Sequence, residues 1–237
     1  MISTDDMTGL KAVFFDLGGT LIKPSSEPDT RIFEMFTSML HEDDPRFTIE
    51  DFRDMNHRYW QDMQNEYYSL RKELSIEEYN SRFLRKEGFS EKSSVRIGEL
   101  FPEIVYQYEL ETTELMPGAM ELLTWLKING FRMGIITNAS HSEARIRGLI
   151  RKVGIEDFFD IVVVSSEVGI RKPDAGIFMM ALSTLGVEPN ESLYIGDRYD
   201  YDASGAQNTG MRWILLDNQT NLYSVMDILK KAAIKKG

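Results

Sequence analysis

The feature that most constrains the fold is a regular alternation of short apolar runs with segments of helical spacing, which begins after residue 118. The runs are GII, IVVV, LYI and WILL, and each has the length of a buried strand. Strands that alternate with helices form a parallel sheet covered on both faces, and such strands are apolar throughout. The sequence therefore predicts strands at 132–137, 161–164, 192–195 and 212–216, and helices at 119–129, after a Ser140-x-x-Glu143 cap, near Asp174 and near Ala203.

A further apolar run, LKAVFF at residues 10–15, ends at Asp16 and the loop Gly18-Gly19-Thr20, which is typical of a buried strand that enters a tight loop. From residue 23 to residue 114 charged and aromatic residues dominate, and we predict no buried strand there. Thr48-x-x-Asp51 and Ser75-x-x-Glu78 indicate capped helix starts in this segment. We therefore predict an α/β fold, with a three-layer Rossmann-like parallel sheet core of residues 1–22 and 115–237 and an inserted α-helical domain at 23–114.

Composition narrows the class of partner. The formal net charge of −11 repels nucleic acid and anionic membranes. No apolar stretch reaches the roughly 20 residues that span a bilayer, and no signal-peptide pattern opens the chain. The absence of cysteine excludes disulfides, thiolate metal sites and cysteine nucleophiles. We expect a cytoplasmic monomer or homodimer that binds neither nucleic acid nor membrane.

Side chains that can carry chemistry follow the predicted strands, and ligands of open parallel sheets bind beyond the carboxyl ends of the strands. Taken alone, each has an ordinary explanation, since an aspartate after a strand often caps a helix and most lysines lie on the surface. Together they supply a nucleophile, metal ligands, a cation and a hydroxyl group, which is what phosphoryl transfer requires. They are Asp16 with Gly18, Thr137 with Asn138, Lys172, Asp197 and Asp202.

Four segments carry a resemblance to a known family. FFDLGGTL resembles the first motif, hhhDxDGTL, of the haloacid dehalogenase superfamily, and IITNAS, RKPD and GDRYDYD are similar to the second, third and fourth motifs. The motifs occur in the family's order, and the resemblance covers residues 10–21 and about 115–217. The helical segment lies where the family inserts its C1-type cap domain. The resemblance implies a capped α/β hydrolase that acts on a small phosphorylated metabolite.

The resemblance also implies a role for each candidate residue. Asp16 would attack phosphorus and form an aspartyl-phosphate, which water then hydrolyses. Lys172 would neutralise Asp16 and the phosphoryl group, while Thr137 and Asn138 would hold phosphate oxygens. The cofactor would be Mg²⁺, bound by Asp16, the backbone carbonyl of Gly18, Asp197 and Asp202.

One position departs from the family's pattern. Its phosphatases usually carry a second aspartate, the general acid–base, where this chain has Gly18. A general acid–base contributes about 10²–10⁴-fold to the rate, so an enzyme that lacks it can still be active. Three interpretations follow: a phosphatase with a substitute acid or an activated substrate, a phosphonate or haloacid hydrolase, or a catalytically weak protein that binds a phosphorylated ligand or a partner. Because the family's dehalogenases need no metal, the pair Asp197 and Asp202 favours the first, whereas a phosphonate hydrolase would use a cap lysine such as Lys72 or Lys86.

The inserted segment has no motif of its own. We expect its aromatic residues to form the core of a helical bundle and its charged residues to face solvent. If a basic residue did face the site, the substrate would carry a second anionic group. The residues concerned are Tyr59, Trp60, Tyr67, Tyr68, Arg71 and Lys72.

Overall fold

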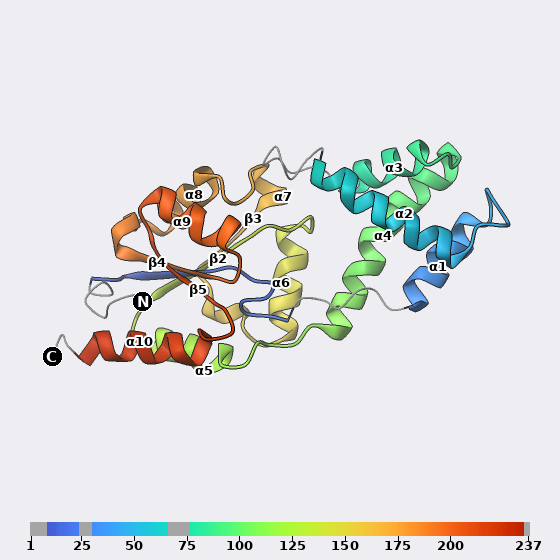
Figure 1. The fold of residues 1–237 in the computed structure, drawn as a ribbon. Helices are drawn as coiled ribbons and strands as arrows, with labels where there is room; N and C mark the ends of the chain where they lie inside the picture. The colour runs from blue at the N-terminus through green and yellow to red at the C-terminus, as the bar shows by residue number, and fades with distance from the viewer. Residues whose placement is uncertain (1–8, 24–29, 66–75, 235–237) are drawn as a thin grey trace. The chain divides into compact units, whose positions relative to one another are not determined.

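In the computed structural model, residues 9–23, 30–65 and 76–234 of the chain's 237 are described. The strands form one five-stranded sheet in the order β3-β2-β1-β4-β5, and every neighbouring pair is parallel (Figure 1). This confirms the predicted α/β fold with a parallel sheet and a helical insertion. The strands are β1 (Ala12–Phe15), β2 (Arg132–Thr137), β3 (Ile161–Val164), β4 (Ser192–Gly196) and β5 (Arg212–Leu215).

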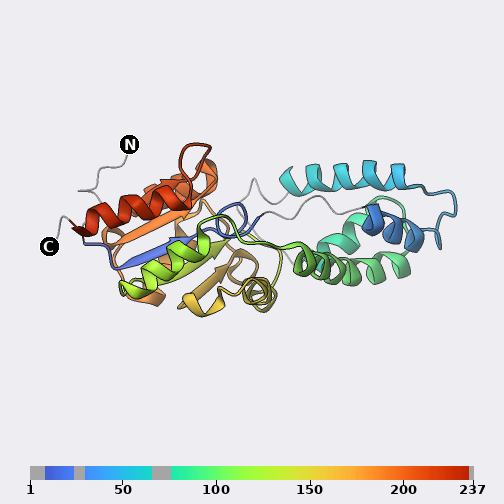
Figure 2. The ribbon, with the colours of Figure 1, turned by 90° about the horizontal axis from the view of Figure 1, so that it is seen from below.

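Helices cover both faces of the sheet. α5 (Ala119–Ile128) and α10 (Leu222–Ile234) lie side by side on one face, and α8 (Ala175–Leu185) and α9 (Ser204–Thr209) lie on the other (Figures 1 and 2). Every residue of β1 and β4 is buried, as expected for central strands covered twice. The remaining elements of this part are α6 (Glu143–Lys152), α7 (Ser165–Val168), η3 (Glu156–Phe158), η4 (Pro189–Glu191) and the π-helical turn η5 (Tyr199–Ala203).

Two predicted helix starts differ from the structure. Helix α6 begins after Ser142 rather than Ser140, because the Ser142 hydroxyl accepts the N–H of Arg145 and so caps the first turn. The segment near Ala203 begins as the π-helical turn η5 and only then becomes α9. The predicted start of α8 is confirmed, since the Asp174 carboxylate accepts the N–H of Gly176.

The helical insertion contains α1 (Thr30–Leu40), α2 (Ile49–Met63), α3 (Ile76–Lys86) and α4 (Glu91–Thr112). The chain divides into two compact units, Met1–Pro24 with Thr113–Gly237, and Ser25–Thr112. Thr48 and Asp51 form the predicted capping box of α2, whereas Ser75 lies outside the described residues. That the second unit acts as a cap stays a prediction.

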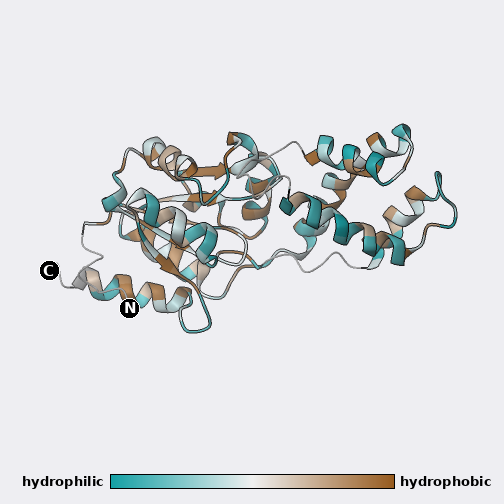
Figure 3. Ribbon diagram, turned by 45° about the horizontal axis from the view of Figure 1, so that its top comes forward, coloured by the Kyte–Doolittle hydropathy of each residue, from teal (hydrophilic) through white to brown (hydrophobic). Residues whose placement is uncertain are grey.

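The helical unit has an apolar core of its own. Figure 3 shows polar and apolar residues interleaved along its helices, whereas the strands of the other unit are mostly apolar. Tyr59 lies in the helical core, as predicted, but Trp60 is 53% exposed, because adjacent residues of a helix lie about 100° apart around its axis. Tyr67, Tyr68, Arg71 and Lys72 lie outside the described residues.

None of the helices in residues 9–23, 30–65 and 76–234 combines the length with the apolar character that a bilayer span requires.

Candidate active site

The candidate residues gather at the carboxyl edge of the sheet. Asp16 follows β1 and Asp197 follows β4, and these two strands are neighbours in register. Thr137 is the last residue of β2, on the other side of β1. From β1 the chain continues to β2 and β3 on one side, and then crosses to β4 and β5 on the other side of β1. The strand order therefore reverses beside β1, and open α/β sheets bind ligands at such a topological switch point, beyond the carboxyl ends of the strands.

Three carboxylates converge there. Asp16, Asp197 and Asp202 each offer an oxygen, and these oxygens lie within 4.8 Å of one another. Asp202 belongs to η5, whose first turn returns it toward the sheet: its N–H donates to the carbonyl of Arg198, and its Oδ2 accepts the Arg198 N–H at 3.0 Å. A Cβ atom on Gly196 would lie 2.4 Å from the Asp202 carboxyl carbon, so this approach requires a glycine at the end of β4.

Lys172 lies between two of these carboxylates. Its Nζ donates to Asp16 Oδ1 at 2.6 Å and to Asp202 Oδ1 at 2.7 Å, and its side chain is almost completely buried. Its backbone is fixed by the amide of Asn138, whose Oδ1 accepts the Lys172 N–H at 2.8 Å and whose Nδ2 donates to the Lys172 carbonyl at 3.0 Å. The Asn138 side chain therefore holds Lys172 in place, a role that its sequence position did not suggest.

Two further polar residues of the site, one of them in the loop named from the sequence, had been given no role. Thr20 is completely buried, and its hydroxyl donates a long hydrogen bond of 3.4 Å to Asp197 Oδ1. Tyr194 is completely buried in β4, and its hydroxyl contacts both Lys172 and Asp202. The motif FFDLGGTL places Thr20 beside the site without assigning its contact, and a tyrosine in an apolar strand is a common feature, so the sequence offered no sign of the Tyr194 contacts.

Burial and charge shift the pKa values of the site. Burial raises the pKa of Asp16 from its ordinary value of 3.8 to about 6; Lys172 opposes this rise, and Asp202 adds to it. Burial also raises the pKa of Asp197, with a further contribution from Asp202. Burial lowers the pKa of Lys172, but Asp16 and Asp202 more than compensate, so the ammonium stays charged. The site therefore holds an ionised nucleophile candidate at neutral pH beside a permanent cation.

The donor set fits a hard divalent cation. Carboxylate oxygens are the ligands that Mg²⁺ prefers. Lys172 occupies only Oδ1 of Asp16, which leaves Oδ2 available. A single ammonium among the three carboxylates leaves excess negative charge, which a divalent cation would neutralise. These residues form an acidic cluster suited to a metal ion.

Two known enzymes are similar to this chain over most of its length. The chain is 32% identical to the pyrimidine 5'-nucleotidase YjjG of Escherichia coli K12 over 207 residues, which cover 84% of this chain and 82% of that one. It is 31% identical to a glyceraldehyde 3-phosphate phosphatase of Methanothermobacter thermautotrophicus over 215 residues, 89% of this chain and 87% of that one.

Solved structures share the fold. The hydrolase YfnB of Bacillus subtilis, solved with bound magnesium, superposes with a TM-score of 0.62 at 18% identity, over 93% of this chain and 99% of that one. A family model covers most of this chain, residues 10–210, and describes haloacid dehalogenase-like hydrolases. The match to the family model and the two sequence relatives, together with the clustered aspartates, show that the chain belongs to the haloacid dehalogenase-like hydrolase family.

Proposed function

We propose that this chain is a Mg²⁺-dependent phosphatase of a small phosphorylated metabolite, with Asp16 as its nucleophile. The observation that carries the proposal is the convergence of Asp16, Asp197 and Asp202 within 4.8 Å of one another. A haloacid hydrolase needs a carboxylate nucleophile but no metal. That activity would therefore not explain why Asp197 and Asp202 lie beside Asp16. The relatives named as phosphatase and nucleotidase, at 31% and 32% identity, support the same reaction.

The chemistry proceeds in two displacements. One oxygen of the Asp16 carboxylate attacks phosphorus, the bond from phosphorus to the leaving oxygen breaks, and an aspartyl-phosphate forms. A water molecule then attacks phosphorus, the bond to Asp16 breaks, and inorganic phosphate leaves. Before the first displacement Lys172 donates to Asp16 Oδ1 at 2.6 Å, which fixes the orientation of the carboxylate that the substrate meets.

Mg²⁺ would be held by Asp16, the backbone carbonyl of Gly18, Asp197 and Asp202. When bound, it supplies charge neutralisation to the phosphoryl oxygens. The proposed ligands of those oxygens are the hydroxyl of Thr137, at the buried end of β2, and the backbone N–H of Asn138, because the Asn138 side chain already binds the Lys172 backbone. Lys172 lowers the repulsion between the carboxylate and the anionic substrate.

The leaving group sets the choice of substrate. Gly18 has no side chain to protonate a departing alkoxide, so the proposed enzyme acts best where the leaving oxygen is a weak base. Acyl phosphates and aryl phosphates meet that requirement without help. Nucleotides and triose phosphates, suggested by the relatives' names, would need a proton from another group.

The test measures phosphate release from p-nitrophenyl phosphate, acetyl phosphate, pyrimidine nucleoside monophosphates and glyceraldehyde 3-phosphate, with Mg²⁺ and with EDTA. Asp16→Asn should abolish release. Asp200→Asn is the matched control, because Asp200 is an exposed carboxylate three residues from Asp197, and it should retain activity. Release that persists in EDTA, or in Asp16→Asn, would disprove the proposal.

The same panel addresses the alternatives. A phosphonate hydrolase needs a free cap lysine, but Lys86 is paired with Asp62 at 2.6 Å, and Lys72 lies outside the described residues. If no phosphate ester is cleaved, phosphonates and fluoroacetate form the next panel. Tight, saturable binding of a phosphorylated compound without turnover would favour a binding protein.

A further inference from the structure

The ammonium group of Lys172 uses all its hydrogen-bonding capacity on the protein. A lysine ammonium has three N–H donors. Here the Nζ atom lies 2.6 Å from Asp16 Oδ1, 2.7 Å from Asp202 Oδ1 and 2.9 Å from the Tyr194 hydroxyl oxygen. The first two acceptors are carboxylates of the proposed catalytic machinery. The third is a neutral group, from the strand beside β1.

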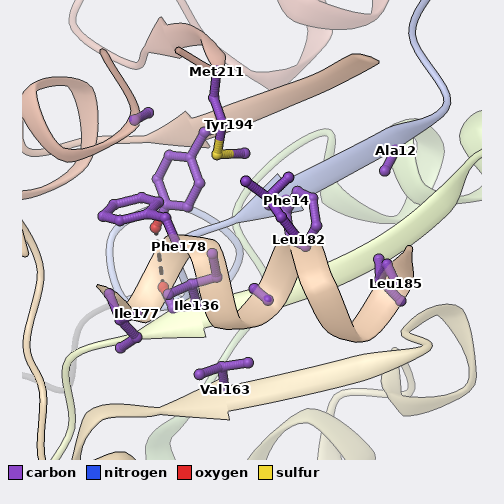
Figure 4. Packing of buried hydrophobic residues seen from close by; sticks show 12 residues of the cluster. Ala12, Phe14, Ile136, Val163, Ile177, Phe178, Leu182, Leu185, Tyr194 and Met211 are labelled. Carbon is purple, nitrogen blue, oxygen red and sulfur yellow. Dashed lines mark hydrogen bonds between the residues drawn. The ribbon is translucent and has the colours of Figure 1, made fainter. Parts of the chain in front are cut away.

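The Tyr194 hydroxyl is itself held from two sides. It donates to the carbonyl of Ile136 in β2 at 3.0 Å, the bond drawn in Figure 4, and it lies 3.2 Å from Asp202 Oδ1. Its single proton serves one of these acceptors, while its lone pair accepts from Lys172. The ring packs edge-on against Phe178 with centroids 5.1 Å apart, in the buried cluster that Figure 4 shows. The hydroxyl therefore has a fixed position.

Packing alone does not explain this tyrosine. Phenylalanine would fill the same place among apolar neighbours without an oxygen, and burying a hydroxyl group is unfavourable unless it is hydrogen-bonded. Tyr194 is completely buried, and its oxygen contacts Lys172, which joins the proposed nucleophile to a proposed metal ligand.

We propose that Tyr194 is a positioning residue, whose hydroxyl fixes the direction of the Lys172 ammonium toward Asp16. This inference rests on the proposed function for its kinetic consequence but not for its structural one. During the proposed reaction Asp16 gains and loses a phosphoryl group, so its attraction for Lys172 changes. Tyr194 stays neutral and anchored to β2, and so keeps the ammonium in place through both displacements.

The test compares Tyr194→Phe with Tyr79→Phe. Tyr79 is also buried and donates its hydroxyl proton to Asp62 at 2.9 Å, so both variants lose one buried hydroxyl and keep the ring. With p-nitrophenyl phosphate and Mg²⁺, Tyr194→Phe should lower kcat about tenfold with KM within about twofold, as expected for one lost orienting hydrogen bond. Tyr79→Phe should leave kcat per folded molecule unchanged.

A second readout needs no turnover. In ¹⁵N-lysine-labelled protein the buried Lys172 ammonium should give a slowly exchanging ¹⁵Nζ–¹H signal, assigned by its loss in Lys172→Met. The proposal expects this signal to shift and to exchange faster in Tyr194→Phe but not in Tyr79→Phe. An unchanged signal in Tyr194→Phe overturns it, and so does a kcat equal to that of wild type. If wild type does not cleave the ester, the proposed function fails, and the NMR comparison alone decides the role of Tyr194.

Discussion

A Cβ atom on Gly19 would lie 2.5 Å from Oδ2 of Asp197, closer than non-bonded atoms approach. Gly19 also has a φ of +84°, in the left-handed region that L side chains rarely adopt. Its neighbour Gly18 differs on both counts, because its φ lies outside that region and a Cβ there would meet nothing within 4 Å. In the loop after β1, the position of the Asp197 carboxylate therefore requires a glycine at position 19 but not at position 18.

We expect Gly19→Ala to damage the metal site. The added methyl group must displace Asp197 or strain the backbone, at a cost on the order of 1–2 kcal/mol, and either change moves a proposed ligand. Mg²⁺ affinity by isothermal titration calorimetry should fall at least about tenfold. Gly18→Ala is the matched control and should bind Mg²⁺ like wild type. Equal affinities in the two variants would contradict the prediction.

The open space beside Gly18 allows an acid to be introduced. We expect Gly18→Asp to fold and to raise the rate on alkyl phosphates relative to p-nitrophenyl phosphate, by up to about 10²-fold, because a carboxylic acid can protonate the poorer leaving group. The measurement is the ratio of kcat/KM for glycerol phosphate and p-nitrophenyl phosphate. Gly18→Asn has the same shape without a titratable proton. If both variants changed the ratio equally, proton transfer would not be the cause.

The positions of the strands along the chain could be predicted because each apolar run ends at a polar residue or a glycine, as at Phe15 and Asp16, whereas their order in the sheet came only from the fold. The meeting of Asp16 and Lys172, 156 residues apart, was predicted only because parallel strand ends share an edge and the motifs match a family. Local pattern could not choose between Ser140 and Ser142 as the cap, since both serines precede the helix. Nor could it assign Tyr194, because only the folded sheet brings its hydroxyl to Lys172.

The raised pKa of Asp16 makes a prediction about stability in EDTA. The folded-state pKa is about 6 and the ordinary value is 3.8, so the folded protein binds the proton more tightly than the unfolded chain does. This contribution to stability is fully present below pH about 4 and is lost as pH rises through 6, by up to about 3 kcal/mol in the free energy of unfolding. Urea denaturation at several pH values between 4 and 8 measures it.

Asp16→Asn is the control for that experiment, because asparagine does not titrate and other groups contribute equally to both proteins. The difference in unfolding free energy between variant and wild type should grow as pH rises through 6. A difference that stayed constant with pH would show that Asp16 has an ordinary pKa in the folded protein. Added Mg²⁺ should reduce the pH dependence, since bound metal and proton compete for the same carboxylate.

The segment that leads into the helical unit, residues 21–23, is hydrogen-bonded to the segment that leads out of it, residues 114–116, so the helical unit can be removed. The Lys23 N–H donates to the Glu114 carbonyl at 2.8 Å, and the Met116 N–H donates to the Leu21 carbonyl at 2.9 Å. A Gly-Ser linker of about four residues can therefore join Lys23 to Glu114 as a tight turn. The candidate site residues all belong to the unit that remains. We expect this shortened protein to fold and to bind Mg²⁺ within about threefold of wild type, because its core and ligands are intact.

Turnover of p-nitrophenyl phosphate by the shortened protein should fall at least about tenfold if the helical unit serves to exclude water during the reaction. Circular dichroism and calorimetry check the first expectation, with Asp197→Asn in the shortened protein as the control that must lose metal binding. A shortened protein that folds yet binds no Mg²⁺ would mean that the helical unit supplies a metal ligand, contrary to the site proposed here.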